Sequence, residues 1–119
     1  EDTITFDESI SNDTIFLGDQ NLSIDKHLNI ISELSKNIHI MSESNSSTIQ
    51  NSAPNVGKGL TIKGLHIHSS NTGIGAIENN GNLTLEDVVL HKWEGSATST
   101  IVNQSGANVI LKGECKIIE

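Results

Sequence analysis

Short bursts of alternating apolar and polar residues run along most of this chain, separated by bends rich in Gly, Asn and Ser. Residues 75–90, GAIENNGNLTLEDVVL, are typical, with one isoleucine before an Asn-Asn-Gly turn and two alternating bursts after it. Alternation with a period of two predicts strands that bury one face. The brevity of the bursts and the frequency of the bends predict an all-β chain of many short strands.

The bursts return with a period of about 25 residues, which is the mark of a repeat architecture. Segments 48–53, 76–81 and 100–106 each place an isoleucine two positions before an asparagine. A second alternating unit lies downstream of each of these segments. These second units span 60–67, 83–90 and 109–117, and an earlier stretch, 22–31, has the same apolar spacing as the last of them.

The repeat favours a coiled solenoid over a β-meander. A meander also turns every few residues, but it is not expected to return the same side-chain types after three bends. In a coil, each burst lies about 4.8 Å from its counterpart in the previous coil, in parallel register. We therefore predict a single domain over residues 1–119, an all-β parallel solenoid of about four coils.

The alternation also predicts which side chains face the interior of the solenoid. On the strand pair at 60–67, for example, the apolar residues face inward while Thr61, Lys63 and His66 face outward. The predicted inward set is Ile24, Leu28, Ile30, Ile49, Leu60, Ile62, Leu65, Ile67, Ile77, Leu83, Leu85, Val88, Leu90, Ile101, Val109, Leu111 and Ile117.

Residues 75–90 resemble the repeat of secreted bacterial right-handed parallel β-helix proteins with the pectate-lyase-like fold. That repeat has a Gly-Ala-Ile-x-Asn step followed by Gly-x-Leu-Thr-Leu and a further short apolar strand, as here. Residues 2–31 are similar to the start of many bacterial surface β-helix domains, which implies an irregular N-terminal coil. Adhesins, autotransporter-like surface proteins and polysaccharide-active enzymes share these motifs, so the resemblance implies a right-handed β-helix rather than one activity.

Composition and charge narrow the range of partners. The net charge is −8, with seven basic residues that are all lysines, so we expect no nucleic-acid partner. No apolar run approaches the roughly 20 residues that a membrane span needs. The chain begins with Glu1, which suggests a processed mature form or an excised domain, and we expect a secreted, extracellular protein that is in some forms attached to the cell surface.

The sequence does not favour catalysis. Pectate lyases use a basic residue, commonly arginine, near calcium-binding carboxylates, and this chain has no arginine. Glu86 and Asp87 are adjacent, so in a strand they point to opposite faces and cannot act together on one substrate. We therefore expect no enzyme, no catalytic residues and no cofactor, and a polysaccharide-active enzyme is the least favoured interpretation.

Two features give candidate binding positions. Overlaying 65–68 on 88–91 places His68 beside His91 one coil away, where two imidazoles could hold a metal ion. We favour the simpler interpretation, in which these are ordinary surface histidines, no metal site exists, and zinc leaves the melting temperature unchanged. Trp93 is a candidate contact for a ligand or partner such as a sugar ring, although covering a loop or the end of the core is the favoured role.

Three asparagines recur at one place of the repeat: Asn51, Asn79 and Asn103. Stacked asparagines on neighbouring parallel strands can form a hydrogen-bonded ladder. Asparagine also tolerates bend conformations, which is a compatible structural explanation.

The ends of the solenoid suggest self-assembly. Terminal coils expose unpaired strand edges, and both ends of this chain have a strand-like pattern without an evident capping helix. Contacts between unlike ends give an open filament. We therefore expect a non-enzymatic structural subunit that stacks on copies of itself, and the alternative is an adhesin or glycan-binding module of a larger surface protein. The residues expected at the assembling ends are Ile4, Phe6, Cys115, Ile117 and Ile118.

Overall fold

The computed structural model describes residues 2–54, 57–71, 73–96 and 98–119. Within these ranges the secondary structure is almost entirely short strands, with one turn of 3-10 helix. The elements are β1 (Asp2–Thr5), β2 (Thr14–Phe16), β3 (Leu22–Ile24), β4 (Leu28–Ile31), η1 (Leu34–Lys36), β5 (His39–Met41), β6 (Ile49–Asn51), β7 (Leu60–Lys63), β8 (His66–His68), β9 (Ile77–Asn79), β10 (Asn82–Glu86), β11 (Val89–His91), β12 (Ile101–Asn103), β13 (Asn108–Lys112) and β14 (Lys116–Ile118).

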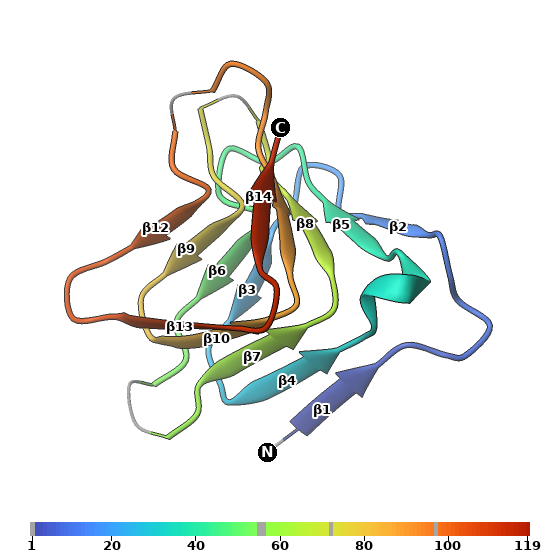
Figure 1. Ribbon diagram of the computed structural model, residues 1–119. Coiled ribbons are helices and arrows are strands. Elements are labelled where there is room, and N and C mark those ends of the chain that lie inside the picture. Colours follow the sequence, from blue (N-terminus) through green and yellow to red (C-terminus); the bar gives the residue numbers. More distant parts are fainter. Residues whose placement is uncertain (1, 55–56, 72, 97) are drawn as a thin grey trace.

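The strands form three parallel sheets that surround a common interior (Figure 1). Sheet A has the order β1-β4-β7-β10-β13, sheet B has the order β2-β5-β8-β11-β14, and sheet C has the order β3-β6-β9-β12. The chain visits the three sheets in turn, so each coil adds one strand to each sheet. The predicted parallel β-solenoid of about four coils is confirmed.

The register agrees with the repeat seen in the sequence. Leu83 lies opposite Leu60 on one neighbouring strand and opposite Val109 on the other. The isoleucine–asparagine segments form β6, β9 and β12, which are successive strands of sheet C. Equivalent positions of successive repeats therefore lie side by side, one strand spacing apart.

One alignment from the sequence is wrong. Residues 22–31 supply β3 in sheet C and β4 in sheet A, whereas residues 109–118 supply β13 in sheet A and β14 in sheet B. The two segments are therefore one strand out of phase. Their apolar spacing is alike because every strand alternates in the same way, and this alternation does not reveal which side of the coil a strand occupies.

In the first coil the strands pair regularly with the second coil, whereas the loops that connect these strands are less regular. Its strands β1, β2 and β3 pair in parallel with β4, β5 and β6 of the second coil. The connection over residues 6–13 is held by Lys36 in η1, whose Nζ donates hydrogen bonds to the backbone carbonyls of Phe6 (3.4 Å) and Asp7 (3.1 Å). The second coil thus anchors the loop of the first.

A residue with left-handed backbone geometry turns the chain from sheet A to sheet B in the last three coils. Gly64, Asp87 and Gly113 follow β7, β10 and β13, with φ angles of 72°, 51° and 65°. Asp87 adopts this geometry while its Oδ1 accepts a hydrogen bond from the Glu114 backbone N–H (2.9 Å). The corner therefore repeats in register, as the strands do.

No helix among the described residues is long and apolar enough to cross a bilayer.

The predicted core is confirmed where each strand has a neighbouring strand on both sides. There the apolar side chains fill the interior of the solenoid. The buried members of the predicted inward set are Ile24, Leu28, Ile30, Ile49, Leu60, Ile62, Leu65, Ile67, Ile77, Leu83, Leu85, Val88 and Leu90.

Burial decreases at the last strand of each sheet. Ile101 in β12 and Val109 in β13 are only partly buried, whereas Leu111 in β13 and Ile117 in β14 were predicted to face inward and are 59% and 60% exposed. Both lie in register with buried leucines of the preceding coil, so they occupy inward positions. They are exposed because no described coil covers them.

Candidate functional site

Four histidines lie on the outer face of sheet B. His39 is in β5, His66 and His68 are in β8, and His91 is in β11, so they come from three successive coils. Each of these strands buries its central residue, so the residues on either side of it project outward. The alternation of a single sheet face thus gathers histidines that are far apart in the sequence.

The parallel register places the imidazoles in two stacked pairs. His39 lies opposite His66 with ring centroids 4.2 Å apart and planes 14° apart. His68 lies opposite His91 with centroids 4.0 Å apart and planes 8° apart. Because His66 and His68 are on the same strand, the two pairs are neighbours and form one cluster, which we call the histidine cluster.

Ring nitrogens of the two pairs contact one another. His39 Nδ1 lies 2.7 Å from His68 Nε2, and His66 Nδ1 lies 2.9 Å from His91 Nε2. The other ring nitrogen of His39, Nε2, lies 3.0 Å from Asn37 Oδ1. Since an amide oxygen only accepts, Nε2 carries the proton there, and Nδ1 directs its lone pair toward His68.

The surroundings keep the cluster uncharged near neutral pH. Burial, followed by repulsion from the other imidazoles, lowers the pKa of both His68 and His91 to about 4. Burial also lowers the pKa of His39 and His66. Neutral imidazole is the form that binds a metal ion.

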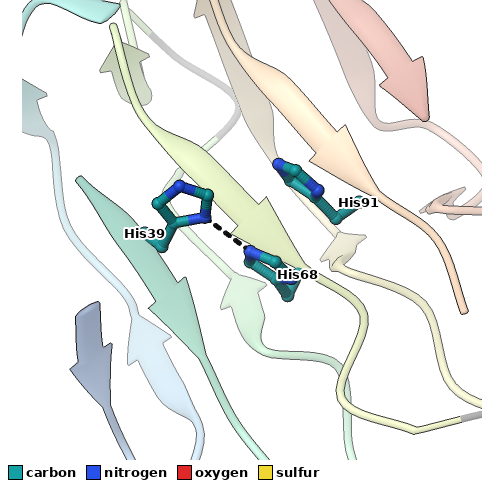
Figure 2. A group of neighbouring side chains, drawn as sticks. All are labelled: His39, His68 and His91. Atoms are coloured by element: carbon teal, nitrogen blue, oxygen red, sulfur yellow. Dashed lines mark hydrogen bonds between the residues drawn. The ribbon is translucent and has the colours of Figure 1, made fainter. Parts of the chain in front are cut away.

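Three members of the cluster offer converging ligand atoms. One ring nitrogen from each of His39, His68 and His91 lies within 4.8 Å of the other two, and all three side chains are half-buried. Figure 2 shows the three rings projecting from adjacent strands toward a common point. This set could hold a metal ion, or its imidazoles could pass a proton along their contacts.

A hollow of about 340 Å³ lies beside the cluster and is partly lined by His68 and His91. Its apolar wall includes Phe16, Met41 and Trp93. The Trp93 indole is half-exposed, and its Nε1 donates a hydrogen bond to the backbone carbonyl of Ser69 (3.1 Å). Glu43, Glu94 and Glu119 also line the hollow.

The repeated asparagines form a buried ladder on sheet C. Asn51 Nδ2 donates to Asn79 Oδ1 (2.7 Å), and Asn79 Nδ2 donates to Asn103 Oδ1 (2.8 Å). Asn51 and Asn79 are fully buried, and both also bond backbone groups of the adjoining bends. The ladder is therefore part of the scaffold.

The residues expected at the assembling ends occupy the two opposite ends of the stack. Ile4 in β1 is exposed and Phe6 is partly buried at one end. At the other end Ile117 and Ile118 are exposed, and Cys115 is partly buried with its Sγ near the Leu85 carbonyl (3.5 Å). The open interior at this second end forms a hollow of about 100 Å³, lined by core and last-coil side chains.

The sequence overlay paired His68 with His91, and these residues are opposite each other in the structure. It missed His39, and it did not bring His66 into contact with the pair. A signal was present, because Ile-His-Ile at 38–40 has the same pattern as Leu-His-Ile at 65–67. Extending the overlay back by one coil would have found the cluster.

Comparison of the chain with models of known protein families, with curated proteins and with solved structures gives no match. The fold is therefore established by the strand pairing, and the likeness to β-helix repeats rests on the motifs of residues 75–90.

Proposed function

We propose that this chain is a non-enzymatic extracellular structural protein, a β-solenoid subunit that stacks end to end on copies of itself into a filament or surface fibre. The observation that carries the proposal is where its large exposed apolar side chains lie. Apart from Trp93, the described ones all belong to the end strands β1, β2, β13 and β14. They are Ile4, Ile15, Phe16, Ile110, Leu111, Ile117 and Ile118.

Register makes the two ends complementary. In sheet A one inward column runs through Ile4, Ile30, Ile62, Leu85 and Leu111, and in sheet B the matching column runs through Ile15, Ile40, Ile67, Leu90 and Ile117. A second copy that continues both sheets would place its Ile4 against Leu111 and its Ile15 against Ile117. Each contact would join two aliphatic side chains, as every internal step of these columns does.

The outer face of sheet B continues in the same way. Phe16 and Ile118 both follow the inward positions of their strands by one residue and are both exposed. In the stacked arrangement the Phe16 ring of one copy would cover the Ile118 side chain of the other. The unpaired edges of the end strands would also gain hydrogen-bonding partners, which supports association of sheets A and B.

Sheet C has one strand fewer than the other two sheets. A junction that continues sheets A and B therefore leaves a gap of one strand in sheet C. A junction with this gap is weaker than the contact between two coils of one chain. The average mass of the assembly should therefore depend on protein concentration. Contacts between unlike ends do not close on themselves, so growth gives a filament rather than a closed dimer.

The extracellular location is part of the proposal, because residues 75–90 resemble repeats of secreted proteins. Light scattering over a concentration series, up to millimolar, tests the assembly. The average mass should rise with concentration, and electron microscopy should show fibres. A chain that stays monomeric over the whole series would overturn the proposal.

Complementary variants test the junction itself. Leu111→Lys and Ile4→Glu should each be monomeric alone, because a charge then faces an aliphatic side chain at every junction. A mixture of the two should regain mass, since Glu would meet Lys at every second junction. Thr84→Lys is the matched control, because it adds the same charge on the outward face of the inner strand β10, between Thr61 and Ile110.

The hollow beside Trp93 favours a second candidate function, a glycan-binding module. The aromatic and glutamate side chains that line it offer a stacking face and hydrogen-bond acceptors for a sugar. Binding of soluble oligosaccharides, measured by calorimetry and by emission of the single tryptophan, tests it. Trp93→Ala should abolish binding while Trp93→Phe retains part of it, and equal binding by Trp93→Ala would contradict the candidate.

A further inference from the structure

We infer that His39, His68 and His91 form a binding site for a divalent transition-metal ion of the Zn²⁺ class, which ties three successive coils together. This inference is independent of end-to-end assembly, because the three side chains lie on the outer face of the inner strands β5, β8 and β11 of sheet B and not on the end strands β2 and β14. With only two histidines paired, the sequence favoured no zinc effect. The third imidazole changes that expectation.

The geometry needs only small adjustments to accept an ion. Zinc–nitrogen bonds are about 2.0–2.1 Å long, so two nitrogens of a tetrahedral site lie about 3.3 Å apart. His39 Nδ1 and His68 Nε2 are 2.7 Å apart, and the ligand atoms of all three residues lie within 4.8 Å of one another. Side-chain rotations that move these atoms by about 1 Å would complete three bonds to zinc.

The neighbours of the three rings support a ligand role. The Asn37 side-chain oxygen fixes the proton of His39 on Nε2 and leaves Nδ1 for the ion. Asn37 is itself held, because its Nδ2 donates to Asn12 Oδ1 (3.2 Å). The His66 ring stacks on His39 and contacts His91 through Nδ1, so it positions both. An outer layer of this kind is typical of metal-binding histidines.

The chemistry of the ligands selects the class of ion. Imidazole nitrogens suit Zn²⁺, Cu²⁺ and Ni²⁺, whereas Ca²⁺ and Mg²⁺ require mainly oxygen ligands. Three protein nitrogens leave a further coordination position for water or an exogenous ligand. The hollow that His68 and His91 line would give such a ligand access to the ion.

An ion at this place would act as a cross-link along the stack. His39, His68 and His91 belong to β5, β8 and β11, three consecutive strands of sheet B. They are separated by 29 and 23 residues of sequence, so an ion joining them closes two long loops through one point. Metal binding to the folded chain should therefore raise its melting temperature.

Calorimetric titration of ZnCl₂ into chelator-treated protein, at concentrations where the chain is monomeric, tests the inference. We expect one Zn²⁺ per chain with a Kd below about 10 µM. Zinc should also raise the melting temperature by several degrees, and Co²⁺ should give the visible absorption of a low-coordinate site. His39→Gln and His91→Gln should each weaken binding by about tenfold or more.

His27→Gln is the matched control, because His27 lies outside the cluster and its Nδ1 accepts a hydrogen bond from the Gly59 backbone N–H (2.9 Å). This variant should bind zinc as the parent does. Circular dichroism of each metal-free variant checks that it is folded. No saturable zinc binding to the parent, or the same affinity in a folded double variant His39→Gln/His91→Gln, would overturn the inference.

Discussion

Asn51 and Asn79 share a hydrogen bond of 2.7 Å between two fully buried amides, one coil apart on sheet C. Asn79 Oδ1 also accepts from the Gly81 backbone N–H (3.3 Å), and its Nδ2 donates to the Gly81 carbonyl (3.0 Å). One side chain thus satisfies both the ladder and the bend that follows β9. The two explanations for the repeated asparagines, ladder and bend, therefore operate together.

Replacing Asn79 with alanine should destabilise the protein by about 2–4 kcal/mol, because it breaks the buried bond from the Asn51 amide and removes the side-chain acceptor of the Gly81 backbone N–H. Asn103→Ala should cost less than about 1 kcal/mol, because Asn103 is exposed and water can replace its contacts. Urea unfolding of the monomeric chain measures both values. Equal costs at the two positions would contradict the importance of burial in the ladder.

The histidine cluster should make the metal-free protein sensitive to mild acid. The pKa of His68 and of His91 is about 4 in the folded state against about 6.5 when unfolded, so the unfolded chain binds more protons between these values. Stability should therefore be greatest above about pH 6.5 and fall as the pH decreases toward 4. The slope should stay below about 1.4 kcal/mol per pH unit per histidine, since both rings are partly exposed and solvent screens the effect.

Unfolding in the presence of a chelator, measured at several pH values, checks this dependence. The variant His68→Gln/His91→Gln should show a flatter profile between pH 4 and 6.5. The lowered pKa values of Asp2 and Asp7 affect stability only near and below their ordinary value of 3.8, outside this window. An unchanged slope in the double variant would assign the acid sensitivity to other groups.

The register of the coils could be predicted from the sequence because each coil repeats both the alternation and the side-chain types. Leu60, Leu83 and Val109 begin equivalent bursts, and the structure places them side by side. Alternation does not specify the side of the coil, however, which is why residues 22–31 were assigned the wrong phase. Alternation also does not reveal which inward side chains are covered by another coil. Leu111 therefore faces the interior as expected but is exposed at the end of the stack.

The candidate site was only partly predictable for a related reason. Pairing His68 with His91 needed one overlay, whereas adding His39 needed the spacing between the second and third coils. That spacing is 27 residues from His39 to His66, against 23 residues from His66 to Val89 in the next coil, so it follows no fixed repeat. The hollow beside Trp93 was not predictable, because it depends on where loops between the strands place Trp93 and Glu94.

The corner after β7 should tolerate no side chain. Gly64 has a φ of 72°, and a Cβ added there would meet the Ser32 carbonyl oxygen of the preceding coil. Gly64→Ala should cost about 2–3 kcal/mol or more, from left-handed strain and from separation of the two coils. Gly18→Ala is the matched control, because Gly18 has a φ of 65° with open space around it and should cost only about 1 kcal/mol. Similar unfolding energies for the two variants would contradict the close approach of the coils.

The two edges of β14 differ in their hydrogen bonding. Lys116 N–H donates to the Val88 carbonyl (3.0 Å), and the Ile118 carbonyl accepts from Lys92 N–H (2.7 Å), so both of these residues direct their backbone groups toward β11. Backbone groups alternate between the two edges of a strand. The backbone N–H and C=O of Ile117 therefore point to the open edge, where a stacked copy would pair.

Ile117→Pro should shorten or abolish filaments while leaving the central coils folded, because proline removes an edge donor without breaking a bond to β11. Lys116→Pro is the comparison: it removes the bond to the Val88 carbonyl, so it should detach the last coil and lower the melting temperature as well. Light scattering reports the mass of each variant, and thermal unfolding reports its stability. Fibres of unchanged length from Ile117→Pro would show that copies do not join through β14, and would leave side-chain contacts or another surface as the route of assembly.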